Sequence, residues 1–173
     1  QADMVMCTLG VSLDNVEYTF RIAKAQGTTT LLNPAPAAAL SPEMLQLADY
    51  IIPNESELAV IAGAPVTGDT ITERVRQLLA RADQTIIVTL GAEGARWVTQ
   101  ADSGHIPTFS VDVVDTVGAG DAFNAGFAVA LAEGQSLADA IRFANANAAL
   151  SVGTIGAVAG MPLRSTVDDF LAG

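Results

Sequence analysis

The stretch Asp115–Phe123 combines small residues and carboxylates in a spacing that suits phosphate chemistry. Gly118, Ala119 and Gly120 stand directly before Asp121, and a helical pattern starts at once behind them. Small residues let backbone N–H groups converge on an anion without obstruction, and the helix adds the positive end of its dipole. A carboxylate at the mouth of such a hole is unfavourable unless it handles protons. The spacing therefore predicts a phosphoryl-transfer site with Asp121 as general base.

The same stretch has a simpler structural interpretation, in which a tight turn needs glycine and Asp121 complements the helix dipole. The full pattern is nevertheless more specific than a lone GxGxxG, and two rival phosphate motifs do not fit. A Walker A loop needs GxxxxGK[ST], but the only lysine, Lys24, lies inside a helical pattern. A dinucleotide fingerprint needs a third glycine early in the fold, but Phe123 occupies that position late in the chain.

Asn54 and Glu57 form a second candidate group, because residues three apart share one face of a helical turn. An amide and a carboxylate at that spacing could hold the water shell of Mg²⁺, which keeps several waters and takes few protein ligands. Ordinary helix capping, with Asn54 as the cap and Glu57 as its partner, explains the same spacing. The two roles can coexist.

The turn Thr89–Gly94 follows the most apolar strand pattern, and its glycines would let backbone approach a nucleotide or simply make a hairpin turn. Asn145 and Asn147 lie in an otherwise apolar helical pattern. Asparagine is unfavourable inside a helix, so we expect one of them to face a polar ligand or a loop. His105 is the only histidine and is expected at a strand surface, so the sequence supports no zinc site.

The order of elements indicates an α/β protein with a mostly parallel sheet covered on both faces, a three-layer α-β-α arrangement. An antiparallel meander is expected late in the sheet, and ligands are expected beyond the carboxyl ends of the strands. Strands are predicted at Met4–Leu9, Thr29–Asn33, Tyr50–Ile52, Thr85–Leu90, Arg96–Thr99 and His105–Phe109, with Val111–Val114 as a possible continuation. Helices are predicted at Asp14–Gln26, from Ser41, from Asn54 to Ile61, and at Thr70–Ala82, Ala119–Ala132, Leu137–Ser151 and Thr166–Leu171, the last begun by Ser165 and Asp168.

Composition narrows the possible partners. The 173 residues are 50% apolar, enough for a single domain over residues 1–173. A net charge of −11 argues against nucleic acid and anionic membranes as partners, so a bound polyphosphate must rely on backbone donors and a metal ion. Cys7 is the only cysteine, which favours a reducing, cytoplasmic compartment. The chain starts without Met in a strand pattern, and we interpret it as a piece of a longer protein.

These motifs together resemble the ribokinase / phosphofructokinase-B family of carbohydrate kinases. Asp115–Phe123 matches the C-terminal signature of that family, and Asn54–Glu57 resembles its Asn-x-x-Glu motif. Asn33–Ala37 resembles a segment typical of ribokinases, and Thr89–Gly94 resembles the nucleotide loop. The likeness extends from Ala2 to Leu171.

The resemblance implies an ATP-dependent sugar kinase that uses Mg²⁺ and K⁺ and could form a homodimer at full length. It implies that Asp121 takes the proton of the sugar hydroxyl and that the backbone of Gly118, Ala119 and Gly120 forms the anion hole. Asn54 and Glu57 would support Mg²⁺ and the phosphates. The residues implied for the ATP site are Thr89, Gly91, Glu93, Gly94 and Asn145. Those implied around the monovalent cation are Asp115, Val117, Ser151, Thr154, Gly156 and Gly160.

Two departures from the family pattern bear on function. The N-terminal half of the family, with its glycine-rich sugar motif and small β lid, has no counterpart in this sequence. Gly10 stands where ribokinases often place a glutamate that contacts the sugar. The chain is therefore expected to be the C-terminal nucleotide-binding and catalytic portion of a sugar kinase. The alternatives are a non-catalytic nucleotide-binding or regulatory module and, with weaker support, a dinucleotide oxidoreductase.

Overall fold

A computed structural model describes residues 2–173 and divides them into two compact units. The first unit extends to Leu90 and also includes Arg96–His105. The second consists of Gly91–Ala95 and Ile106–Gly173. None of the helices in residues 2–173 is long and apolar enough to cross a membrane.

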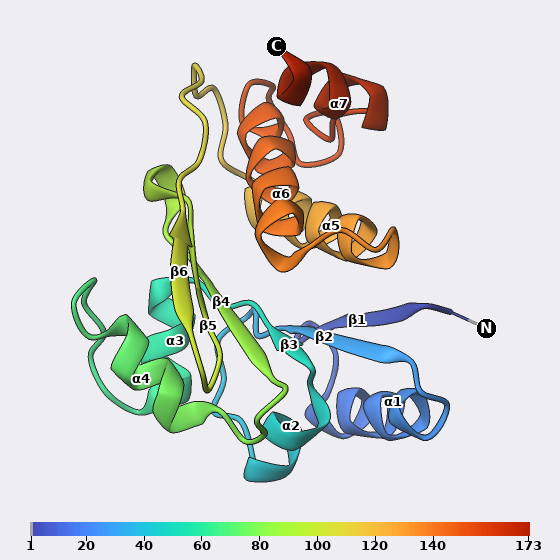
Figure 1. Cartoon of the computed structure of the whole chain (residues 1–173), viewed down its shortest axis with the longest axis vertical. Coiled ribbons are helices and arrows are strands. Elements are labelled where there is room, and N and C mark those ends of the chain that lie inside the picture. The colour runs from blue at the N-terminus through green and yellow to red at the C-terminus, as the bar shows by residue number, and fades with distance from the viewer. Residues whose placement is uncertain (1) are drawn as a thin grey trace. The chain divides into compact units, whose positions relative to one another are not determined.

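A mixed sheet of six strands forms the framework, in the spatial order β1-β2-β3-β4-β5-β6 (Figure 1). The strands are β1 (Met4–Thr8), β2 (Thr29–Asn33), β3 (Tyr50–Ile51), β4 (Thr85–Thr89), β5 (Ala95–Val98) and β6 (Ser103–Ile106). The first four pair in parallel, with Leu32 opposite both Cys7 and Ile51. The predicted α/β class, a mostly parallel sheet with some antiparallel pairing, is confirmed.

Four helices belong to the first unit: α1 (Leu13–Ala25), α2 (Pro42–Leu47), α3 (Glu55–Ala62) and α4 (Ile71–Leu78). The predicted starts of α2 and α3 are confirmed, whereas α4 ends at Leu78, before the predicted end at Ala82. The Ser41 hydroxyl caps α2 by accepting from the Met44 N–H, and α3 ends at Gly63 in the left-handed region. The apolar faces of these helices and strands share one core, which includes Val16, Phe20, Leu32, Ile51, Leu58, Ile71, Val75, Ile86 and Val88.

The second unit contains the short helix η1 (Gly91–Glu93) and the helices α5 (Ala119–Ala132), α6 (Leu137–Ser151) and α7 (Arg164–Ala172). α5 and α6 have the predicted bounds and pack closely against each other. A Cβ atom added to Gly126 in α5 would lie 3.0 Å from Cβ of Asn147 in α6. The side chain of Asn147 donates to the Ala122 carbonyl at 2.6 Å, so an amide also joins the two helices.

Two predictions of local structure are wrong. The strands predicted at His105–Phe109 and Val111–Val114 are replaced by β6, which ends at Ile106, and by a segment without strand structure. Pro107 has no N–H to continue a ladder, and the Ile106 carbonyl already accepts from Asn145. The last helix begins at Arg164 with Leu163 as its cap, so Ser165 does not cap it. Asp168 accepts instead from the Arg164 guanidinium.

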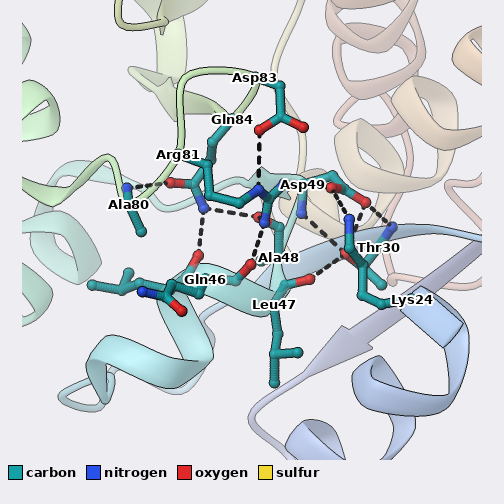
Figure 2. A network of polar contacts seen from close by, with 11 residues as sticks. Lys24, Thr30, Gln46, Leu47, Ala48, Asp49, Ala80, Arg81, Asp83 and Gln84 are labelled. Atoms are coloured by element: carbon teal, nitrogen blue, oxygen red, sulfur yellow. Dashed lines mark hydrogen bonds and ion pairs between the residues drawn. The ribbon is translucent and has the colours of Figure 1, made fainter.

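A polar network ties together the amino-terminal ends of β2, β3 and β4, and Asp49 is its centre (Figure 2). The Asp49 carboxylate accepts from the Thr30 N–H at 2.9 Å and from Lys24 at 2.6 Å, and Arg81 contacts it from the other side. Gln84 donates to the carbonyls of Leu45 and Ala48. Burial alone would raise the pKa of Asp49, but the hydrogen bonds from Lys24 and Thr30 and the charge of Lys24 outweigh it and lower the pKa.

Replacing this carboxylate should destabilise the first unit. In Asp49→Asn an amide nitrogen replaces one acceptor oxygen and faces either the Thr30 N–H or the cations of Lys24 and Arg81, so we expect a loss of about 1–3 kcal/mol in the free energy of unfolding. Urea titration of both proteins measures it. The exposed Asp69→Asn serves as a control, because Asp69 has no hydrogen bond or ion pair within the described part of the chain.

The pH dependence provides a second readout of the same group. Because the folded-state pKa of Asp49 is lowered, its contribution is present at neutral pH, above the ordinary carboxyl pKa of about 3.9. It is lost as the pH falls through the lowered pKa. The stability difference between wild type and Asp49→Asn should therefore shrink below pH ~4, and a constant difference down to acid would contradict the assignment.

Candidate active site

The turn that begins α5 is shaped by Gly118. This residue caps the helix with φ of +86°, in the left-handed region that favours glycine. A Cβ atom at Gly118 would also lie 2.8 Å from Cβ of Ala157. Both the backbone conformation and the close neighbour therefore require glycine at this position.

The N–H groups of the turn are mostly free. The Ala119 N–H donates to the Thr116 carbonyl at 3.2 Å and closes the turn. Within residues 2–173, the N–H groups of Gly118, Gly120 and Asp121 have no hydrogen-bond acceptor. Unpaired donors at the first turn of a helix attract anions. The turn can thus offer backbone donors to a phosphate, with the Ala119 N–H already engaged.

Asp121 lies in the first turn of α5 with its side chain exposed. Among the residues that the structure describes, no hydrogen bond or ion pair engages its carboxylate. Gly120 precedes it, and a Cβ atom there would meet nothing within 4 Å. Neither backbone strain nor crowding within the chain explains why residue 120 is a glycine. A need for space beside a bound ligand would explain it.

Asp115 lies at the other end of the motif and is bound on both oxygens. Its Oδ1 accepts from the Val117 N–H at 3.0 Å, and its Oδ2 accepts from the Gly156 N–H at 2.8 Å. These hydrogen bonds, first that of Val117 and then that of Gly156, lower the pKa of Asp115. The carboxylate therefore joins the α5 turn to the loop that follows α6.

Oxygen atoms that could hold a monovalent cation converge in the same loop. The Gly160 N–H donates to the Gly156 carbonyl at 2.8 Å. A Cβ atom at Gly160 would lie 2.5 Å from the Ser151 carbonyl oxygen and 3.2 Å from that of Gly156, so these two carbonyls face one small space. Carbonyl oxygens suit hard cations, and the residues fit such an ion. Thr154 is exposed, and no hydrogen bond joins it to the others within residues 2–173.

Asn54, Glu57 and Thr89 lie together in the first unit. The Asn54 side chain accepts from the Glu57 N–H at 2.8 Å, and Glu57 accepts from the Asn54 N–H at 2.8 Å and from its side chain at 2.9 Å. Asn54 also forms a parallel bridge with Thr89, where β4 ends. The predicted helix capping by Asn54 and Glu57 is therefore present, and the half-buried Glu57 carboxylate keeps lone pairs that could bind ordered water.

Gly94 and Asn145 meet on one segment of the second unit. A Cβ atom at Gly94, where φ is +93°, would lie 2.3 Å from the Ile106 carbonyl oxygen. The absence of a side chain at Gly94 therefore lets the backbone at Ile106 come close. The Asn145 side chain, only 3% exposed, donates to the carbonyls of Ile106 at 3.0 Å and Pro107 at 3.2 Å. The expectation that one of the helical asparagines faces a loop is met by Asn145. Gly91 and Glu93 both lie in η1, next to Gly94.

Sequence reasoning missed two residues in this region. Asn124 is buried in α5, and its Oδ1 has no hydrogen-bond partner. Ala157 is the residue against which Gly118 packs. The sequence did offer a sign of Asn124, because a polar residue inside an apolar helical pattern is unusual. Nothing in the local pattern marks Ala157, because its contact joins segments distant in sequence.

Comparison with known proteins agrees with this geometry. The model of the pfkB family of carbohydrate kinases matches residues 3–164, so the chain belongs to that family. It is 40% identical over 169 residues to a ribokinase of Staphylococcus aureus, which covers 96% of this chain and 56% of that protein. A deoxyribokinase of Salmonella typhi is 35% identical over 174 residues, covering 99% of this chain and 57% of the relative.

A solved structure supports the fold over nearly the whole chain. Arabidopsis thaliana ribokinase, in a complex with ribose and ATP, superposes with a TM-score of 0.93 at 30% identity, covering 99% of this chain and 56% of that one. The ribokinase-like fold class expected from the sequence is thereby confirmed. The chain spans a little over half the length of the relatives it matches.

Replacement of Gly118 and of Gly120 by alanine should change stability by different amounts. Gly118→Ala meets both a left-handed φ and Ala157, so we expect a loss of about 1–3 kcal/mol in the free energy of unfolding. Gly120→Ala meets neither and should change stability by less than ~1 kcal/mol. Denaturant titration of the two variants in the full-length protein measures the contrast, and equal losses would contradict it.

Proposed function

We propose that the whole protein transfers a phosphoryl group from ATP to a sugar hydroxyl, and that residues 1–173 form its C-terminal nucleotide-binding and catalytic portion. Membership of a carbohydrate kinase family supports the reaction class. The neighbour that binds ribose and ATP supports the two substrates. Because relatives include a ribokinase and a deoxyribokinase, the proposal names the class of sugar and leaves the particular sugar to experiment.

Asp121 is the proposed general base. One observation carries this proposal: an exposed carboxylate without a partner in the described chain follows unpaired N–H groups at the start of α5. The carboxylate accepts the proton of the sugar hydroxyl as the oxygen attacks the γ-phosphorus of ATP. The bond from that phosphorus to the bridging oxygen breaks, and ADP leaves. The N–H groups of Gly118 and Gly120 stabilise the charge on the transferring group, with Ala119 closing the turn.

Two cations belong to this proposal. Mg²⁺ bound to ATP neutralises phosphate charge, and Asn54 and Glu57 are the proposed residues that support its water shell. For K⁺, the proposed set is Asp115, Val117, Ser151, Thr154, Gly156 and Gly160, of which Ser151 and Gly156 present converging carbonyls. A bound K⁺ supplies positive charge beside the anion hole. Thr89, Gly91, Glu93 and Gly94 remain proposed for the nucleotide, and Asn145 is proposed to act by holding residues 106 and 107.

The second candidate is a nucleotide-binding or regulatory module without catalysis. ADP formation separates the two functions. Incubation of the full-length protein with ATP and a panel of pentoses should produce ADP only when a sugar acceptor is present. ATP binding without ADP formation for any sugar would favour the module.

Removal of the proposed base should affect turnover far more than nucleotide binding. Asp121→Asn keeps the shape but cannot accept the proton, so we expect kcat to fall about 10²–10⁴-fold with little change in the Kd for ATP. Steady-state kinetics and calorimetric titration of the full-length protein measure these quantities. Asp112→Asn, an exposed aspartate nearby in the chain, is the matched control. Unchanged turnover in Asp121→Asn would reject the assignment.

A bulky side chain at Gly120 should obstruct the phosphate while leaving the fold intact. Its Cβ position is open, so Gly120→Val should fold normally yet lower kcat/KM for ATP by roughly 10²-fold, as expected when an anion-hole donor is blocked. Ala125→Val, at an exposed position on the same helix, is the control and should retain activity. Wild-type kinetics in Gly120→Val would mean that the phosphate lies elsewhere.

A further inference from the structure

Two segments of the second unit, residues 114–118 and 152–157, are joined by several hydrogen bonds. The N–H groups of Val114 and Asp115 both donate to the Val152 carbonyl, at 2.8 and 3.1 Å. The Gly156 N–H donates in return to Asp115 Oδ2 at 2.8 Å. Of these bonds, only the last uses a side chain. Backbone hydrogen bonds therefore align the two segments at Val152. At Gly156, the contact between them depends on the Asp115 carboxylate.

The two oxygens of Asp115 have different tasks. Oδ1 accepts from Val117, two residues ahead, and holds the local turn that leads into Gly118. Oδ2 accepts from Gly156, forty-one residues away in sequence, and holds the distant loop. Acceptors with full negative charge make stronger hydrogen bonds than neutral ones. The lowered pKa of Asp115 is consistent with a carboxylate that stays ionised in both contacts.

The anion-hole turn depends on the position of that loop. Gly118 packs on Ala157, the neighbour of Gly156, so the loop limits where the turn can lie. We infer that Asp115 is a positioning residue, whose carboxylate holds residues 152–157 against the turn and so fixes the direction of the free N–H groups at Gly118 and Gly120. Asp115 acts on the phosphate through these backbone groups and does not touch it.

This arrangement also relates Asp115 to the carbonyl pair at Gly160. The Gly156 N–H bonds to Asp115, and the carbonyl of the same residue accepts from Gly160. A shift of Gly156 would therefore move one of the two carbonyls proposed to hold a cation. Loss of the carboxylate should weaken the anion-hole turn and the carbonyl pair together.

Amide hydrogen exchange of the full-length protein tests the contact itself. In Asp115→Ala the N–H groups of Val117 and Gly156 lose their charged acceptor, so both should exchange about 10-fold faster or more. Asp115→Asn keeps one acceptor oxygen and should accelerate only one of the two strongly. Asp112→Asn, whose carboxylate has no hydrogen bond or ion pair among the described residues, should leave both unchanged. Unchanged exchange at Gly156 in Asp115→Ala would overturn the inference.

Kinetics then test whether the contact matters for positioning, and this part rests on the proposed function. Asp115→Ala should lower kcat by about 10-fold or more, with a smaller change in KM for the sugar. Asp115→Asn should recover part of that loss, and a merely structural role would instead lower the fraction of folded enzyme with kinetic constants unchanged. Normal kcat with faster exchange at Gly156 would refute the positioning role. Failure of the Asp121 assignment is distinguishable, because it leaves the exchange result intact.

Discussion

The start of α5 depends on two hydrogen bonds to one carboxylate, those from the N–H groups of Val117 and Gly156 to Asp115. A helix terminus leaves several N–H groups without partners, which costs free energy unless water or a ligand satisfies them. Here the neighbouring turn contacts the Asp115 carboxylate, and Gly118 packs closely on Ala157. These contacts place the unpaired donors within the chain itself, which is what the proposed stabilisation of a transferring group requires.

Glycines and asparagine amides bring segments of the second unit close together. Gly126 lets α5 approach α6, and Asn147 links the two helices through the Ala122 carbonyl. Asn145 holds the carbonyls of Ile106 and Pro107, against which the backbone at Gly94 packs. A buried amide whose nitrogen donates to backbone carbonyls in this way selects one arrangement of the backbone.

The charge of −11 makes the proposed binding of a polyphosphate depend on local groups. Cationic side chains are largely engaged within the protein: Lys24 and Arg81 contact Asp49, and Arg164 contacts Asp168. Asp49 lies just before β3, at the amino ends of the parallel strands, whereas Asn54 and Thr89 lie at their carboxyl ends. The first unit thus places the ion pairs of Asp49 at one end of the parallel strands, and Asn54 and Thr89 at the other.

Local sequence patterns were enough to predict the class of fold and most helix bounds, because strand and helix periodicity, capping residues and glycine spacing act over a few neighbouring residues. The predicted strand beyond Ile106 is wrong, because Asn145 binds a carbonyl that a longer strand would have needed. Three contacts depend on the folded chain as a whole: Gly118 packs on Ala157, Asp115 accepts from Gly156, and Gly94 lies against the backbone at Ile106. Each of these contacts joins residues far apart in the chain, and local sequence carries no information about which distant backbone will come close.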